Sequence, residues 1–362
     1  MEIGIIGLPQ TGKTSIFLAL TKGKISTGGG SSPNVGIARV FDARVKRLEG
    51  MFKPRKTAYP EIKYIDMAAG FAGSGKAEGI RGEFLTHLST VDAMMHVVRV
   101  FDDPSVAHVD VSIDPKRDIE AMDMELAFSD MAIAEKRLQK IEASMKSVKA
   151  HLKDMALKEQ ALLQAVKANL EKEIPLRDMD FSEDDARILE NYQFLTAKPL
   201  IIVLNIGENQ LALVAALEES IRSTHKGKRV GVFSACGKLE AELAQLPDEE
   251  AKEFRGSLGL NESPMDRIAR LSYDLLNYIS FFTVGADEVK AWTITRGTPA
   301  VRAAGKIHSD LEKGFIRAEV VGYEDFIQCG TMAEAKKKGV FRLEGKTYEV
   351  KDGDIMNILF NV

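Results

Sequence analysis

The stretch GLPQTGKTS, residues 7–15, has the residue types and the spacing to bind phosphate. It follows the apolar run Ile3–Ile6, and four residues separate its first glycine from Gly12, Lys13 and Thr14, as in a phosphate-binding loop between a strand and a helix. Glycines let backbone N–H groups turn towards phosphate oxygens, and the helix N-terminus adds positive potential. We expect Lys13 to reach the β- and γ-phosphates as the catalytic side chain and Thr14 to ligate Mg²⁺. The predicted nucleotide contacts in this loop are Pro9, Gln10, Thr11, Gly12, Lys13, Thr14 and Ser15.

A second candidate for the metal is Asp66, the last residue of the alternating stretch EIKYID. An acidic residue at the end of a strand beside the loop strand usually steers the water shell of Mg²⁺. The alternative is an aspartate that caps a turn. The predicted metal ligands are therefore Thr14 and Asp66.

Composition limits the classes of protein that fit the chain. With 362 residues, 45% of them apolar and 28% charged, it is long enough for two or three folded domains and is not disordered throughout. Cys236 and Cys329 lie far apart and have no metal or disulfide spacing, which suits a reducing compartment. Apolar runs such as Leu200–Leu204 are too short to span a bilayer, and no secretion signal is recognisable, so we expect a cytosolic protein. The net charge of −4 gives no global reason for nucleic-acid binding.

Buried strands alternate with helical stretches along the first part of the chain. Besides the run before the loop, the strand predictions are 61–66, 93–101, 198–208 and the start of KRVGVFSACGKLEAEL. This alternation predicts an α/β fold with a mostly parallel sheet that is covered on both faces and binds its ligand at the carboxyl ends of the strands.

The tetrad Asn205-Ile206-Gly207-Glu208 stands where a nucleotide-binding fold of this kind reads the base. The usual guanine reader is Asn-Lys-x-Asp, whose carboxylate accepts two hydrogen bonds from guanine. Here Ile206 replaces the lysine and the longer Glu208 replaces the aspartate, so residue chemistry leaves adenine and guanine both open. Ser234-Ala235 resembles the second base-contact loop, in which backbone N–H groups read the base. The predicted base contacts are Asn205, Ile206, Glu208, Ser234 and Ala235.

Several motifs together resemble the YchF family of Obg-like ATPases. They are GLPQTGKTS, SPNVGIARVFDARVKRL, NIGE, FSACGKLEAEL and the long tail that begins FFTVGADEVKAWTITRGTPAVRAAGKIHSD. The match runs along nearly the whole chain. The resemblance implies a P-loop domain of the translation-factor type (residues 1–118 and 175–278), an inserted helical coiled coil (119–174) and a C-terminal β-grasp domain called TGS (279–362).

The resemblance also implies an activity. It points to a nucleoside triphosphate hydrolase that uses Mg²⁺, binds ATP and ADP in preference to GTP and GDP, hydrolyses slowly unless activated, and associates with ribosomes through the coiled coil and the TGS domain. Adenine is the favoured base on that ground alone. We expect no membrane partner and take a monomer as the default.

Three positions depart from the family pattern. Gln10 stands where the family usually has the asparagine that helps some related enzymes to hold potassium. The switch threonine falls at Gly30, and the family's Asp-x-x-Gly becomes Asp66–Ala69 with Gly70 one place late. These departures predict a competent nucleotide binder whose hydrolysis is very slow or absent.

The segment between Asp114 and Ile174 contains no glycine and only one proline, Pro115, as a long helical hairpin requires. Apolar residues step by three and four along it, although no turn signal shows where the chain reverses. The predicted seam contains Leu138, Ile141, Met145, Val148, Leu152 and Met155 and continues through Leu163, Val166 and Leu170.

Basic residues gather on one face of this hairpin at Lys146, Lys149 and Lys153. One interpretation is a solvated surface with ion pairs four residues apart. The other is contact with the phosphates of ribosomal RNA. The sequence leaves both open.

The tail from about Ser280 has short alternating strands and a helical stretch near Met332–Lys338, typical of a small mixed sheet. We expect the ring of His308 to tie a loop to Asp310 or to backbone and assign it no catalysis.

The sequence therefore leaves two main function classes. One is a hydrolase that uses ATP turnover to time its departure from a translation complex, and the other is a binding module gated by a nucleotide, without productive hydrolysis. A GTP-specific GTPase also remains open, whereas a kinase fits less well because no acceptor pocket stands out.

Overall fold

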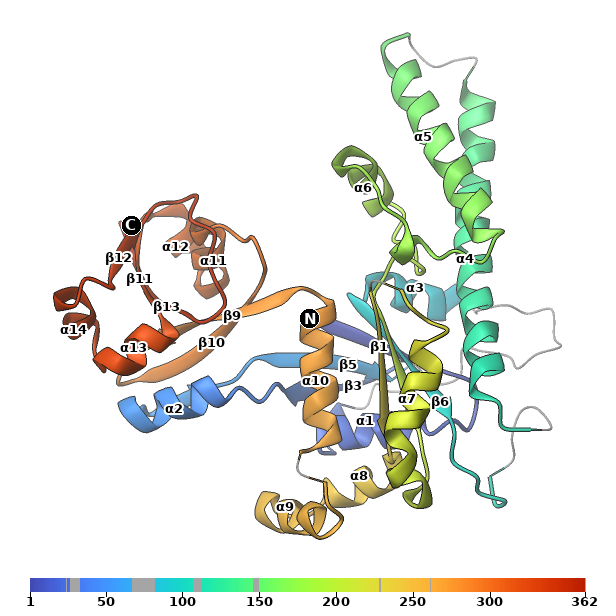
Figure 1. The fold of residues 1–362 in the computed structure, drawn as a ribbon. Coiled ribbons are helices and arrows are strands. Elements are labelled where there is room, and N and C mark those ends of the chain that lie inside the picture. The colour runs from blue at the N-terminus through green and yellow to red at the C-terminus, as the bar shows by residue number, and fades with distance from the viewer. Residues whose placement is uncertain are drawn as a thin grey trace. The chain divides into compact units, whose positions relative to one another are not determined.

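The computed structural model describes residues 1–23, 25–26, 33–66, 82–106, 112–145, 150–227, 229–260 and 262–361. The chain divides into two compact units (Figure 1). The first unit contains Met1–Ala38 and Lys63–Met265, and the second contains Arg39–Ile62 and Asp266–Val362. In the described parts of the chain, no helix is long and apolar enough to cross a membrane.

The first unit is built on a seven-stranded sheet in the order β2-β3-β5-β1-β6-β7-β8. β1 pairs in parallel with β5 and β6, and β6-β7-β8 continue in parallel, whereas β2 and β3 are antiparallel. The predicted α/β fold with a mostly parallel sheet is confirmed. The strands are β1 (Glu2–Ile6), β2 (Ile25–Ser26), β3 (Asn34–Arg39), β5 (Glu61–Asp66), β6 (Ala93–Arg99), β7 (Leu200–Asn205) and β8 (Val230–Ala235).

Helices supply the remaining core of this unit. Met94 and Val98 of β6 share one face of the sheet, since side chains alternate along a strand, and they belong to the same buried cluster as Ile119 and Met122. The helices of the unit other than the hairpin are α1 (Lys13–Thr21), α3 (Gly82–Thr90), η1 (Leu176–Asp178), α6 (Glu183–Glu190), η2 (Glu208–Leu213), α7 (Val214–Arg222), α8 (Gly237–Leu243) and α9 (Asp248–Ser257).

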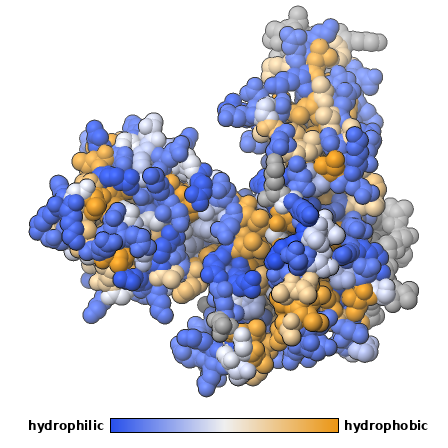
Figure 2. Space-filling model, viewed as in Figure 1, coloured by the Kyte–Doolittle hydropathy of each residue, from blue (hydrophilic) through white to orange (hydrophobic). Residues whose placement is uncertain are grey.

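The predicted hairpin is present as α4 (Pro115–Ser144) and α5 (Ala150–Leu170). Asp114 caps α4, since its carboxylate accepts the N–H groups of Lys116 and Arg117. The seam is confirmed where the two helices pack together in one buried cluster. On the surface of the hairpin, apolar side chains stand among hydrophilic ones (Figure 2). The buried residues that were predicted for this seam are Ile141, Leu163, Val166 and Leu170.

The seam prediction is wrong at Met155, whose side chain is 70% exposed. The chain reverses between the end of α4 and the start of α5, so a spacing counted through that reversal does not stay on one face. Val148, like Lys146 and Lys149, lies outside the described residues.

The second unit contains a six-stranded mixed sheet in the order β12-β11-β13-β9-β10-β4. The strands are β4 (Lys56–Ala58), β9 (Tyr278–Val284), β10 (Glu288–Thr295), β11 (Phe315–Gly322), β12 (Arg342–Glu344) and β13 (Asp354–Phe360). The helices are α2 (Ala43–Phe52), α10 (Pro264–Leu275), α11 (Ala300–Ile307), α12 (Ser309–Lys313), α13 (Tyr323–Cys329) and α14 (Met332–Lys337).

The segment 39–62 packs with the C-terminal part of the chain, although the sequence-based boundaries assign it to the nucleotide-binding domain. Val45 and Leu48 of α2 are fully buried in one cluster with Phe282 and Val289, and β4 extends the sheet by pairing in parallel with β10. Burial of this apolar helix face explains the grouping.

His308 has the structural role that was predicted. Its Nδ1 accepts a hydrogen bond from the backbone N–H of Asp310 at 3.2 Å and so caps α12.

Candidate functional site

The phosphate loop connects β1 to α1, as its spacing predicts. Gly7 has φ 152°, and a Cβ there would lie 2.5 Å from the Val97 carbonyl oxygen. Gly12 has φ 87°, and a Cβ there would lie 2.1 Å from Nδ2 of Asn205. Glycine is therefore required at both positions, because a side chain would clash with neighbouring atoms and because φ is positive. Gln10 also adopts a left-handed conformation, with φ 61°, which is a strained backbone for a residue with a side chain.

Lys13 is the first residue of α1, and its side chain returns over the loop. Its Nζ donates hydrogen bonds to the carbonyl oxygens of Gly7 at 3.0 Å and Leu8 at 2.7 Å. Burial lowers the pKa of Lys13, and the charge of Asp66 opposes this change. The ammonium group thus lies within the loop, where a phosphate would neutralise it.

Thr14 and Asp66 lie together, as expected for residues that share a metal. The Thr14 hydroxyl is 3.4 Å from Oδ2 of Asp66, and Asp66 is 2% exposed. Oδ1 of Asp66 is buried and has no hydrogen-bond partner among the described residues. Burial raises the pKa of Asp66, while the nearby Lys13 charge lowers it. Two oxygen donors, one of them a buried carboxylate, fit the preference of Mg²⁺ for oxygen ligands.

Asn205 connects the phosphate loop to the segments predicted to read the base. Its Nδ2 donates to the Thr11 carbonyl at 2.9 Å, and its Oδ1 accepts the Gly237 N–H at 2.9 Å. Ile206 is buried, and its N–H donates to the Ala235 carbonyl at 3.0 Å. The two predicted base segments therefore meet beside the loop.

The other predicted base residues differ in exposure. Glu208 is exposed at the start of η2, whereas Ser234 is buried. The Ser234 N–H is already bonded, since it donates to Oε1 of Glu218 at 2.8 Å. Glu218 therefore positions the end of β8, a role that the sequence analysis did not identify.

Phe101 is a further residue that sequence reasoning missed. Its ring lies 3.9 Å from the position a Gly12 Cβ would occupy, and its N–H donates to the Asn205 carbonyl at 3.0 Å. The Arg99 guanidinium lies 4.5 Å from the centre of the ring. The available signal was an aromatic residue just after a buried strand, at the edge of the sheet where ligands bind.

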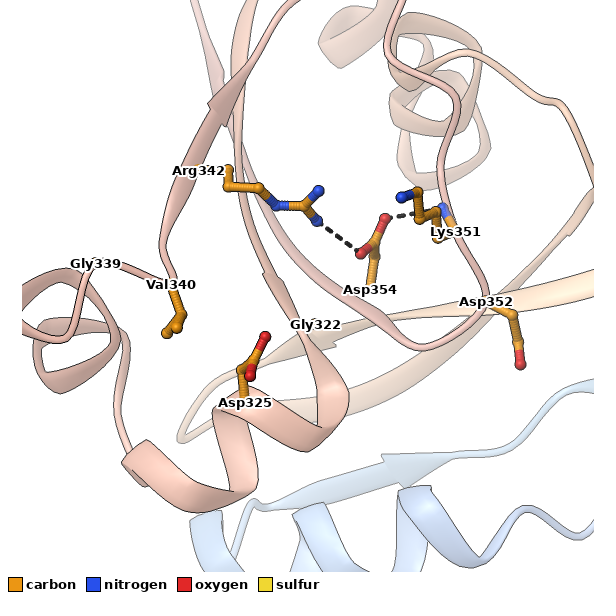
Figure 3. A pocket seen from close by; sticks show the side chains of 8 residues that line it. All are labelled: Gly322, Asp325, Gly339, Val340, Arg342, Lys351, Asp352 and Asp354. Atoms are coloured by element: carbon orange, nitrogen blue, oxygen red, sulfur yellow. Dashed lines mark hydrogen bonds and ion pairs between the residues drawn. The ribbon is translucent and has the colours of Figure 1, made fainter.

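A pocket of about 430 Å³ lies in the second unit (Figure 3). The Arg342 side chain points towards Asp354 and donates to it at 3.2 Å, and the Lys351 N–H donates to the same carboxylate at 2.8 Å. Asp352 points away from this pair and accepts hydrogen bonds from Arg44. Because these groups satisfy one another, we assign the pocket no chemistry.

Comparison with known proteins agrees with this arrangement of loop, hairpin and second sheet. A "Ribosome-binding ATPase YchF" of Bacillus subtilis (strain 168) is 40% identical over 368 residues, covering 100% of both chains. The protein of the same name from Escherichia coli O157:H7 is 38% identical and covers 100% of this chain and 99% of its own. The chain belongs to the YchF family.

Two further comparisons support the family assignment. The "Structure of the Schizosaccharomyces pombe YchF GTPase" has a TM-score of 0.86 at 30% identity and covers 99% of this chain and 97% of that chain. The family model YchF-GTPase_C, described as "Protein of unknown function (DUF933)", matches residues 278–361. The resemblance stated from the sequence is thus confirmed. Two of the positions that depart from the YchF pattern, Gly30 and Ala69, lie outside the described residues.

Proposed function

We propose that this YchF-family chain binds ATP with Mg²⁺ at the 7–15 loop, hydrolyses it slowly, and acts as a nucleotide-dependent switch on ribosomes in the cytoplasm. The observation that carries the proposal is the grouping of Lys13, Thr14 and Asp66 at the start of α1. The Bacillus and Escherichia relatives, whose names contain "Ribosome-binding ATPase", support the nucleotide and the partner.

Each residue has a distinct part in this mechanism. The loop amides and the start of α1 hold the phosphates, and Lys13 leaves its two carbonyl acceptors to stabilise negative charge on the transferred phosphoryl group. Thr14 and Asp66 would hold Mg²⁺, directly or through water. When bound, the ion neutralises charge on the phosphate oxygens. The described residues contain no cluster of three or more His, Cys, Asp or Glu side chains that could hold a metal.

Adenine is the base we propose. The sequence does not decide between the bases, and the names of the relatives include both an ATPase and a GTPase. Ile206 is buried, so this position supplies an apolar side chain where a guanine reader has lysine. The Phe101 ring beside Gly12 adds a second apolar surface. Glu208 is exposed, and among the described residues no hydrogen bond or ion pair fixes its side chain.

A second candidate function is a binding module that changes state with the bound nucleotide but does not turn over. The departures at Gly30 and Ala69 favour it, because they replace groups that sense the γ-phosphate. The two candidates share the same binding site and differ in the rate of hydrolysis.

Single-turnover hydrolysis separates the candidates. The protein is mixed with radiolabelled ATP or GTP and Mg²⁺, with and without ribosomes, and phosphate release is followed. The proposal expects slow release from ATP that is lost in Lys13→Ala and retained in the control Lys22→Ala, whose exposed side chain pairs with Asp248 away from the loop. Tight ATP binding without any release of phosphate would favour the second candidate, a binding module that does not hydrolyse its nucleotide. Unchanged ATP binding in Lys13→Ala would overturn the loop assignment.

A further inference from the structure

Four polar side chains, from three elements and the turn after α7, gather where the sheet of the first unit meets the hairpin. They are His96 of β6, Asp123 of α4, Arg177 of η1 and His225 after α7. Nη2 of Arg177 donates to Asp123 at 2.8 Å, and Nε2 of His225 lies 4.0 Å from the same carboxylate. His96 lies on the face of β6 whose Met94 and Val98 share a buried cluster with Met122, the residue before Asp123. We call these four residues the root cluster.

The root cluster joins the two arms of the hairpin where the hairpin leaves the sheet. Asp123 lies on the outgoing helix, and Arg177 follows the returning helix. The Arg177 side chain is 3% exposed, so its ion pair with Asp123 is shielded from solvent on that side. The Arg177 N–H also donates to the Thr196 carbonyl at 2.9 Å, which joins η1 to the segment that leads into β7.

The same cluster reaches the phosphate loop through β6. His96 stands opposite Ile6 in the parallel pairing of β6 with β1, and Ile6 leads directly into Gly7. Gly7 itself lies against the backbone of the next β6 residue, since a Cβ on it would meet the Val97 carbonyl. A displacement of the loop therefore also displaces the segment of β6 that contains His96.

His96 and Arg177 both have unused hydrogen-bonding groups. His96 is 1% exposed, and neither of its ring nitrogens has a hydrogen-bond partner in the part of the chain that the structure describes. The same holds for Nε and Nη1 of Arg177. Buried polar groups without partners are costly and are rare in folded proteins, so a cluster of them calls for an explanation. An element that exchanges partners between two arrangements provides one.

We propose that the root cluster is the joint through which the nucleotide in the phosphate loop sets the position of the α4–α5 hairpin. The inference rests on the proposed function, because it requires a nucleotide in the loop. Exchange of ADP for ATP shifts the start of the loop against β6, and the unpartnered His96 ring gains a hydrogen bond within the root cluster. The Asp123–Arg177 pair carries that change to both arms. Coupling of this kind is reciprocal, so a partner bound to the hairpin changes nucleotide affinity by the same factor.

The test measures hairpin position in the protein alone. Spin labels are attached at Lys140→Cys on α4 and Glu219→Cys on α7, both exposed positions, in a Cys329→Ser background. Their separation is measured by pulsed electron resonance with ADP and with a non-hydrolysable ATP analogue. The inference expects distance distributions that differ between the two nucleotides in this background and coincide in His96→Phe and in Arg177→Met.

A matched control is Arg137→Met. It removes the ion pair at 2.8 Å between Arg137 and Glu159, which also joins the two arms but lies farther along the hairpin. This variant should keep the nucleotide-dependent change. Asp123→Asn, which keeps the size of the side chain, replaces Arg177→Met if that variant does not fold.

Three outcomes overturn the inference. One is a label separation that does not depend on the nucleotide in the background protein, and another is a change that persists in the root-cluster variants. A protein that binds no nucleotide would overturn the proposed function and this inference together. A fourth result would separate the two proposals. If the label separation depends on the nucleotide and on the root cluster, but ribosome affinity is the same with ADP and with the ATP analogue, the joint is supported and the proposed switch is contradicted.

Discussion

The side-chain amide of Asn205 donates a hydrogen bond to the Thr11 carbonyl over 2.9 Å, so the end of β7 is joined to the phosphate loop. The other end of the same amide accepts the Gly237 N–H at 2.9 Å. One buried side chain therefore fixes the loop, the tetrad 205–208 that is predicted to read the base, and the start of α8 relative to one another. Ligand affinity depends on this arrangement, because a preorganised site loses less entropy on binding.

Replacement of Asn205 by alanine tests this role. Asn205→Ala leaves the Thr11 carbonyl and the Gly237 N–H without their partner, which should lower the free energy of unfolding by about 1–3 kcal/mol. We expect ADP affinity to fall by about tenfold or more, or about 1.4 kcal/mol. Urea denaturation and an ADP titration measure the two effects. Asn209→Ala, at an exposed position nearby, is the control, and equal behaviour of the two variants would contradict the assigned role.

Alanine substitutions at two glycines with similar backbone conformation distinguish the effect of a steric contact from the effect of backbone strain. Gly12 has φ 87° and Gly23 has φ 67°, but a Cβ would meet Asn205 only at Gly12, whereas it would meet nothing within 4 Å at Gly23. Gly23→Ala should therefore cost only the left-handed strain, about 1–2 kcal/mol. Gly12→Ala should in addition displace Asn205 and abolish measurable ADP binding. Thermal unfolding and an ADP titration of both variants check this, and retained ADP binding in Gly12→Ala would show that the loop is not held as described.

His96 should make the protein sensitive to acid. Burial lowers the pKa of His96 to about 4, below its ordinary value of 6.5, so the folded state disfavours the protonated ring. The unfolded chain binds this proton first as pH falls, and the contribution of His96 to stability is therefore present above pH 6.5 and is lost as pH falls towards 4. The loss is at most about 3 kcal/mol.

Asp130 opposes this loss over part of the pH range. Burial raises the pKa of its carboxyl group to about 6, so protonation of Asp130 increases the free energy of unfolding as pH falls. The measurement is therefore the difference in unfolding free energy between the unmodified protein and His96→Phe at each pH. As pH falls from 6.5 to 4, the free energy of unfolding of the unmodified protein should decrease relative to that of His96→Phe. A constant difference would show that His96 does not titrate with a lowered pKa.

Charge reversal on the hairpin tests its contact with ribosomes. If Lys146, Lys149 and Lys153 contact phosphates of ribosomal RNA, replacing all three by glutamate should weaken co-sedimentation. It should also reduce the slope of log affinity against log salt by about 2–3. The control is replacement by glutamate of Lys22 and Lys252, exposed residues of the first unit that lie outside the hairpin. Unchanged, salt-insensitive co-sedimentation of the hairpin variant would favour the solvated-surface interpretation.

The phosphate loop and the parallel strands were predictable because they depend on short-range order. Residues 7–15 carry their own spacing, and the mostly apolar stretches of β6 and β7 are typical of buried strands. The hairpin was predictable for the same reason, from apolar steps of three and four. Its reversal was not, since no glycine, proline or other clear turn signal marks it, and Met155 was assigned to the seam in consequence.

Long-range pairings were not predictable from the sequence. β4 joins the second sheet by pairing with β10, far along the chain, and nothing in the short stretch 56–58 indicates that partner. His96 stands in the apolar run AMMHVVR, where a single histidine gives no hint of Asp123 and Arg177. Asn205 was assigned to the base, whereas its contacts with Thr11 and Gly237 appear only when three segments meet.

A competition titration tests the central claim most directly. Fluorescent ADP is bound to the purified protein with Mg²⁺ and displaced by ADP, by a non-hydrolysable ATP analogue and by the two guanine counterparts. The account predicts that adenine nucleotides displace the probe at concentrations about tenfold or more below those of guanine nucleotides, a difference of about 1.4 kcal/mol. A preference of that size for guanine would contradict it and would show that Glu208 reads the base as a lengthened aspartate.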